Sequence, residues 1–84
     1  MITYRYTIML LRIDGYHKSN GKPHRIDGSN MQFSKALTME SAKSMVTAYF
    51  KEGYYNYAEI RDKEDNTTIF REKGADWKIL KEVA

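Results

Sequence analysis

The chain has 84 residues, a formal net charge of +3 and no cysteine. A chain of this length forms one small domain, here residues 1–84, and without cysteine it has neither disulfides nor thiolate zinc sites to stabilise it. No apolar run approaches the roughly 20 residues that span a bilayer, and residues 1–11 lack the charged and apolar regions of a signal peptide. We therefore expect a cytoplasmic protein that is not inserted in a membrane.

The positive charge is concentrated in the N-terminal part of the chain. Residues 1–37 carry six basic and two acidic side chains, whereas residues 38–84 carry eight basic and nine acidic ones. This asymmetry favours a partner with an acidic surface, either a nucleic-acid backbone or an acidic protein face. An ordinary solvated surface has the same composition, so charge alone does not choose between these interpretations.

Residues 2–13 are predicted to form a long first strand. Apolar side chains alternate from Ile2 to Leu10, which is typical of a strand with one buried face. From Met9 onward the opposite face also becomes apolar, through Leu11 and Ile13. Either the strand enters a region that is covered on both faces, or a bulge changes its register there.

A glycine-rich basic segment at about residues 14–30 is predicted to be a long loop. The tetrapeptide Arg-Ile-Asp-Gly occurs at residues 12–15 and again at 25–28. Because Asp and Gly both favour turns, we interpret the repeat as two turns that frame the loop, with Ile13 and Ile26 anchoring its ends. If this loop binds a partner, we expect it to be mobile alone and to become ordered on binding.

Residues 31–37 resume alternation and are predicted as the second strand, and residues 38–51 as a helix. Thr38 is a suitable N-cap, and Gly53 is placed to end the helix. Apolar residues recur between them at helical spacing and form one stripe that would pack on a sheet. The stripe comprises Ala42, Met45, Val46, Tyr49 and Phe50.

Two more strands are predicted at residues 55–61 and 67–72, and the short polar joint between them indicates a hairpin. The chain after Gly74 fits either a fifth strand, in which Trp77 and Ile79 alternate, or a short helix, and we favour the helix or an irregular tail. The sequence thus predicts an α+β domain with one helix on an antiparallel sheet of four to five strands, in the order ββαββ.

The basic loop is also the best candidate for a binding site. It carries no acidic side chain between Asp14 and Asp27, and its cations could neutralise phosphates while an aromatic ring stacks on a base. Tyrosines after the helix could anchor a protein partner, although we expect two of the three at positions 54, 55 and 57 to complete the core. The predicted partner-binding residues are Arg12, Tyr16, His17, Lys18, Lys22, His24, Arg25, Tyr54 and Tyr55.

Catalysis is a further alternative for the same loop. His17 and His24 could act as the acid/base pair of a metal-independent ribonuclease, with Lys22 or Arg25 stabilising a phosphorane. A glycine-rich loop supports catalytic groups poorly, so we rank this activity below binding. Two histidines without a third ligand are also a poor zinc site, and no nucleotide-binding or hydrolase motif is present. We predict a binding protein that uses no cofactor and no metal and is not an enzyme.

The layout resembles the small single-domain proteins with which phages block host defences, including anti-CRISPR proteins. The segments that carry this resemblance are the strand ITYRYTIMLLRI, the capped helix TMESAKSMVTAYFKEG and the hairpin AEIRDKEDNTTIFREKG. The resemblance implies an inhibitor in the host cytoplasm that binds a host nucleic-acid-handling defence complex. It carries over no residue of that family, so the contacts expected for this chain are the basic loop and exposed tyrosines identified above.

The expected partner is then a protein or a protein–nucleic acid complex with an acidic surface. The alternative is a nucleic-acid-binding module that contacts phosphates through residues 16–25. For either function we expect a monomer or a small homo-oligomer.

Overall fold

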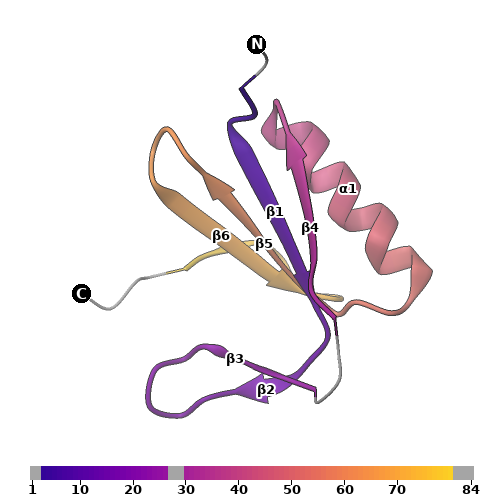
Figure 1. The fold of residues 1–84 in the computed structure, drawn as a ribbon. Coiled ribbons are helices and arrows are strands. Elements are labelled where there is room, and N and C mark those ends of the chain that lie inside the picture. Colours follow the sequence, from indigo (N-terminus) through magenta and orange to yellow (C-terminus); the bar gives the residue numbers. More distant parts are fainter. Residues whose placement is uncertain (1–2, 27–29, 81–84) are drawn as a thin grey trace.

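The structure of the protein is a computed structural model, which describes residues 3–26 and 30–80. Five strands form an antiparallel sheet in the order β4-β1-β5-β6-β7, with the helix α1 packed on one face, and a separate two-stranded ribbon, β2-β3, projects from the end of this sheet (Figure 1). The elements are β1 (Tyr6–Leu11), β2 (Ile13–Tyr16), β3 (Pro23–Arg25), β4 (Gln32–Ala36), α1 (Met39–Glu52), β5 (Tyr57–Asp62), β6 (Thr67–Glu72) and β7 (Lys78–Ile79).

The predicted α+β class, with one helix on an antiparallel sheet of five strands, is confirmed, but the predicted order ββαββ is wrong. One cause is the first strand, predicted at residues 2–13. The chain bends at Arg12, so β1 ends at Leu11 and β2 begins at Ile13. Together with β3, which lies in the segment predicted as a loop, this division places four strands before α1 instead of two.

The second cause is the C-terminal tail, for which a short helix or an irregular tail was predicted ahead of a fifth strand. The tail instead forms β7, in which Ile79 pairs with Ile69 and Lys78 with Phe70. The backbone N–H of Leu80 donates to the Thr68 carbonyl at 2.9 Å and continues this ladder. The outer edge of β6 offers unpaired backbone groups to the tail, and strand pairing satisfies them.

The main core lies between α1 and one face of the sheet, as the alternation in β1 and the stripe in the helix predict. Its buried members are Tyr6, Ile8, Leu10, Ala36, Ala42, Val46, Phe50, Ala58 and Ile60. Met45 and Tyr49 of the predicted stripe are partly buried at the border of this core. The apolar stripe thus fixes which side of α1 faces the sheet.

Both predicted ends of the helix are confirmed. The Thr38 hydroxyl accepts a hydrogen bond from the Ser41 N–H at 3.1 Å. Gly53 has a φ of +89°, which suits glycine, and its N–H donates to the Phe50 carbonyl at 3.1 Å. Within the part of the chain that the structure describes, no helix has the length and apolar character needed to cross a membrane.

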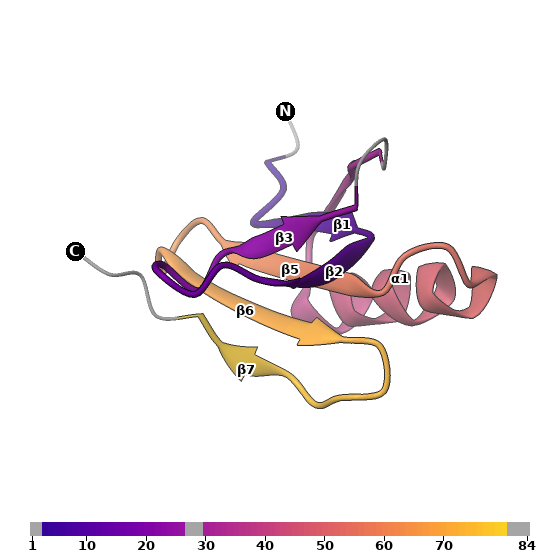
Figure 2. The same ribbon diagram turned by 90° about the horizontal axis from the view of Figure 1, so that it is seen from below.

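The opposite face of the sheet is covered at one end by the β2–β3 ribbon. Leu11, Ile13 and Tyr57 are buried there, in a small second core with the half-buried Met9 and Phe70 at its border. Of the two explanations for the apolar second face of β1, coverage on both faces is therefore correct. Figure 2 shows the tip of the ribbon and α1 on opposite sides of the sheet.

Candidate functional site: the β2–β3 ribbon and the cleft beneath it

The segment predicted as a loop at about residues 14–30 contains a β-hairpin, so that prediction is wrong for its first part. β2 and β3 pair antiparallel, and the chain reverses at residues 18–21. The His17 N–H donates to the Lys22 carbonyl, and the Gly21 N–H donates to the His17 carbonyl, both at 2.9 Å. Gly21 has a φ of +69°, which glycine adopts at little cost. The dipeptide Asn20-Gly21 is a strong hairpin signal that the sequence analysis missed.

The first Arg-Ile-Asp-Gly copy is not a turn, which corrects the interpretation of the repeat. Asp14 and Gly15 lie inside β2, where the pairing with β3 shifts register between Ile13 and Gly15. Ile13 is buried, as expected of an anchor, and Ile26 is half-buried. The Asp-Gly pair of the second copy, at residues 27–28, lies outside the described residues.

Asn56 anchors the root of the ribbon to the main sheet. Its Oδ1 accepts from the Ile13 N–H at 2.7 Å, and its Nδ2 donates to the Ile13 carbonyl at 2.8 Å. Its own N–H donates to the Leu11 carbonyl at 3.1 Å, and its carbonyl accepts from the Lys73 N–H at 2.9 Å. One side chain thus satisfies both backbone groups of a residue that has just left the sheet. Sequence analysis missed this role, because nothing local distinguishes this asparagine.

Arg12 and Tyr54 meet at the outside of the bend between β1 and β2. Arg12 Nη1 donates to the Tyr54 carbonyl at 3.2 Å, and the guanidinium lies 5.6 Å from the centre of the Tyr54 ring. Tyr54 is exposed, whereas Tyr55 packs against the main core and Tyr57 is buried. Two of the three tyrosines therefore complete the core, as expected, and Tyr54 alone among them offers substantial surface beside the ribbon.

Tyr16 holds the free end of the ribbon against the sheet. Its ring makes an edge contact with Tyr57, with centroids 6.1 Å apart, and the Glu72 carboxylate lies nearby. Burial, together with this carboxylate, raises the pKa of Tyr16 to about 12. The Tyr57 hydroxyl donates to Glu59 Oε2 at 2.8 Å, and burial with this bond also raises the pKa of Tyr57. Both phenols therefore stay protonated near neutral pH, and Tyr16 contacts the sheet while remaining partly exposed.

The two histidines lie together on the ribbon. The rings of His17 and His24 are in edge contact, with centroids 4.9 Å apart, and His24 Nδ1 lies 2.5 Å from Asp14 Oδ1. All three side chains are exposed, so nothing around them excludes water. Because the two rings touch, a phosphodiester cannot lie between them. It could reach the pair only from the solvent side. In the described residues, no group of three or more His, Cys, Asp and Glu side chains converges to hold a metal ion.

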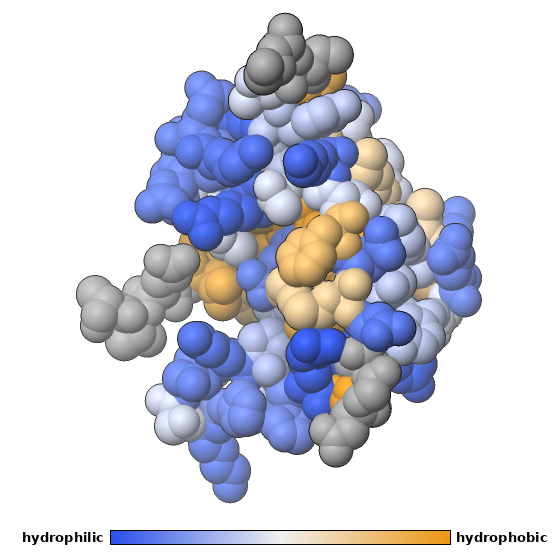
Figure 3. Space-filling view, in the orientation of Figure 1, coloured by the Kyte–Doolittle hydropathy of each residue, from blue (hydrophilic) through white to orange (hydrophobic). Residues whose placement is uncertain are grey.

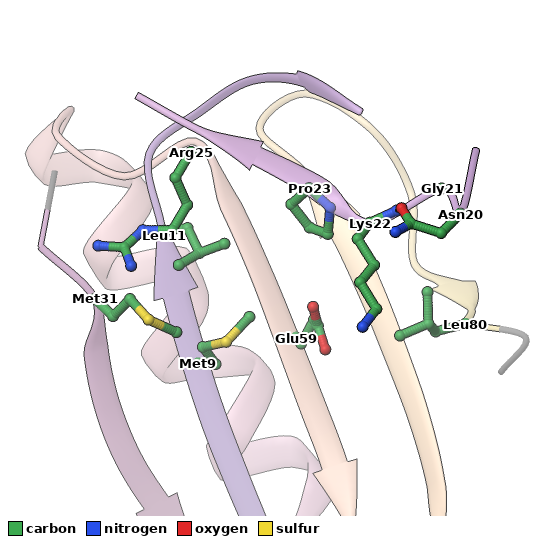
Figure 4. Close-up of a pocket in the computed structure, with 10 residues that line it drawn as sticks. All are labelled: Met9, Leu11, Asn20, Gly21, Lys22, Pro23, Arg25, Met31, Glu59 and Leu80. Atoms are coloured by element: carbon green, nitrogen blue, oxygen red, sulfur yellow. The ribbon is translucent and has the colours of Figure 1, made fainter. Parts of the chain in front are cut away.

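The remaining predicted cations lie at the tip and on the underside of the ribbon. Lys18 is exposed at the tip, whereas Lys22 and Arg25 line a cleft of about 670 Å³ between the ribbon and the sheet. In Figure 4, Lys22 extends into this cleft between Glu59 and Leu80. The cleft therefore has cations on the side of the ribbon and one carboxylate on the side of the sheet.

The floor of the cleft is apolar. Met9 and Leu11 contribute to it from β1, and Met31 and Leu80 from the flanking segments. In Figure 3 the apolar side chains form a band between the hydrophilic ribbon and the hydrophilic upper part of the molecule. The band continues to Phe33, which lies opposite Met9 in the pairing of β1 with β4 and is 58% exposed.

The structure thus brings seven of the nine predicted residues together in residues 12–25, with Tyr54 beside them through its contact with Arg12. Tyr55 is directed into the protein instead. Comparison of the chain with protein-family models, with curated proteins and with solved structures gave no match. The resemblance to phage inhibitors therefore rests on the layout of the chain.

Proposed function

We propose that the protein binds nucleic acid and that the β2–β3 ribbon is the contacting element. The observation that carries this proposal is a projecting two-stranded hairpin whose charge is predominantly positive (Figure 1). Residues 12–25 carry four Lys and Arg side chains, and their one carboxylate, Asp14, is already paired with His24. The major groove of B-DNA admits a two-stranded ribbon of this kind, and Lys and Arg on it would neutralise phosphates.

The anchoring of the ribbon favours this function over a solvated connection. Asn56 fixes its root with two hydrogen bonds, and the contact of Tyr16 with Tyr57 holds its free end. Cations on a preformed hairpin lose less conformational entropy on binding than cations on a mobile loop. The hairpin pairing and these anchors therefore favour a preformed contact over the ordering on binding expected from the sequence.

The salt dependence of binding tests the proposal. The variant Lys18→Gln/Lys22→Gln removes two exposed cations of the ribbon, and Lys35→Gln/Lys63→Gln is a control with the same loss of charge elsewhere. With a labelled duplex, fluorescence anisotropy should show that affinity falls steeply as the salt concentration rises. In a plot of the logarithm of the binding constant against the logarithm of salt concentration, each phosphate contact should contribute about −0.9 to the slope. The ribbon variant should reduce this slope by about 1 for each lysine that contacts a phosphate, and the control should not. Equal slopes in both variants, or no affinity for the duplex or its single strand, would contradict the proposal.

A protein partner is the second candidate, as the resemblance to phage inhibitors implies. The apolar band beside the ribbon favours it, because Met and aromatic side chains are enriched in protein interfaces and a phosphate backbone would leave them uncovered. Phe33→Ser separates the two candidates, since this ring is exposed and lies on β4 of the main sheet instead of on the ribbon. We expect the variant to weaken binding of a captured protein at least tenfold and to leave binding of the duplex unchanged. Loss of duplex binding in Phe33→Ser would show that the band belongs to the nucleic-acid site.

A further inference from the structure

A second basic site lies at the C-terminal end of α1, on the face of the sheet opposite the ribbon. It is a pocket of about 230 Å³ between the last turns of the helix and the end of β6. Its lining residues are Thr47, Phe50, Lys51, Arg71 and Lys73. Three of these five side chains are cationic and none is acidic, which is unusual for a surface whose charges are otherwise mixed.

Arg71 is held in a fixed position at this pocket. Its guanidinium carbon lies 5.4 Å from the centre of the Phe50 ring and 5.7 Å from that of Trp77. Its Nε is buried and has no hydrogen-bond partner in the described part of the chain. The two rings orient the guanidinium but do not accept hydrogen bonds as a carboxylate does, and an unpaired buried donor destabilises a protein. The two rings therefore orient the guanidinium, and its buried Nε has no acceptor among the described residues.

No carboxylate of the described residues forms an ion pair with the three cations, although Lys73 also borders a neighbouring pocket that Asp14 and Glu72 line. Glu72 follows Arg71 in the sequence, but it lies on the other face of the sheet, where it pairs with Tyr57 in the β5–β6 ladder. The C-terminal end of α1 contributes only about half a negative charge. The residues that line the pocket therefore carry a net positive charge.

We propose that this pocket binds a doubly charged oxyanion, namely a phosphate group. The planar fork of Arg71 matches the oxygens of phosphate, and the ammonium groups of Lys51 and Lys73 add point charges beside it. The Thr47 hydroxyl donates to the Lys43 carbonyl at 3.1 Å, so recognition rests on the three cations. The proposal is independent of the function of the ribbon, because none of these residues lies on it.

The test uses the intact chain and inorganic phosphate at constant ionic strength, with chloride as the replaced anion. Lys51→Gln/Lys73→Gln removes the two exposed lysines and retains Arg71, which packs on two rings, and Lys35→Gln/Lys63→Gln is the control of equal charge. NMR titration of the wild type and the control should give saturable shifts at the lining residues, and the pocket variant should bind at least tenfold more weakly. Spectra in chloride alone confirm that each variant is folded.

Titrations with adenosine monophosphate and with adenosine identify the source of the phosphate. Binding of both inorganic phosphate and the nucleotide supports recognition of the phosphate group itself, and binding of the nucleotide alone supports a nucleotide-linked phosphate. The proposal is overturned if phosphate and chloride give the same shifts and the nucleotide does not bind, if adenosine binds as tightly as its monophosphate, or if the pocket variant binds like the wild type.

Discussion

The helix and the ribbon cover opposite faces of the same sheet by different means. On the helix face, α1 buries a continuous apolar stripe against β1, β4 and β5, and its members Ala42 and Val46 are fully buried. On the ribbon face, Leu11, Ile13 and Tyr57 form only a small core, and the two Asn56 hydrogen bonds to Ile13 add to the attachment. The free energy of folding should therefore come mainly from the helix face, because apolar burial is the dominant favourable contribution to folding.

This difference suggests that the helix face provides most of the stability, whereas the ribbon face leaves side chains exposed. The cations of the ribbon and the apolar band beside it remain at the surface, where a partner can reach them. A face that is not needed for most of the stability can carry side chains chosen for binding. The comparison predicts that damage to the helix face unfolds the protein, whereas damage to the attachment of the ribbon acts locally.

The largest effect is expected from Val46→Asp. Val46 is fully buried between α1 and the sheet, so the substitution would place an unpaired charge in the main core. We expect a loss of about 4 kcal/mol or more in the free energy of unfolding, enough to unfold a domain of this size. Urea titration followed by circular dichroism measures it, with Ser44→Asp on the exposed side of the same helix as the control. Similar stability of the two variants would show that the apolar stripe of α1 does not provide most of the free energy of folding.

A smaller and more local effect is expected from Asn56→Ala. The substitution leaves the N–H and the carbonyl of Ile13 without their partners, which should cost about 2 kcal/mol. Hydrogen exchange should become much faster in residues 13–25 than in β1 and β5. Asn66→Gly is the control, since it removes an exposed bond to Arg61 at a position whose φ of 55° suits glycine. A uniform loss of protection would show that the ribbon and the sheet unfold as one unit.

The same contrast explains which features the sequence predicts. The limits of α1 follow from local signals, Thr38 at its start and Gly53 at its end, and its orientation follows from a stripe of period 3.6. All these signals lie within one element. The turn of the ribbon also has a local signal, Asn20-Gly21, although the repeated Asp-Gly is the more conspicuous turn pattern in the sequence.

The attachment of the ribbon and the last strand depend on distant contacts. Asn56 bonds to Ile13 across 43 positions of the chain, and no local pattern reports this pairing. β7 has two residues, too few to show a period, and it forms because β6 has an open edge. The cations of the candidate site were found from composition, whereas the cleft beneath them and the basic pocket beside α1 require the folded chain to bring their walls together.

The smallest effect concerns the end of the sheet away from the ribbon, where Arg5 pairs with Asp62. Arg5 Nε and Nη2 donate to the two carboxylate oxygens of Asp62 at 2.9 and 2.8 Å. The backbone N–H groups of Glu64 and Asp65 donate to Asp62 Oδ1 at 3.0 and 3.3 Å and so tie the β5–β6 turn to the pair. The bonds from Arg5, followed by those from the turn, lower the pKa of Asp62 from 3.8 to about 2.

Because the pKa of Asp62 is lowered in the folded state, its contribution to stability is complete above about pH 4 and is lost as the pH falls toward 2. Urea unfolding of the wild type should therefore show that the free energy of unfolding declines between pH 5 and pH 2. Part of this decline should be absent in Asp62→Asn. The other carboxylates titrate in both proteins, so the difference between the two curves isolates this group. Loosening the attachment of the ribbon should not affect the pH dependence that Asp62 contributes. The double variant Asn56→Ala/Asp62→Asn should therefore show the same loss of pH dependence as Asp62→Asn alone. If the double variant departs from this expectation, the two ends of the sheet are energetically coupled, and the local nature of the ribbon's attachment is contradicted.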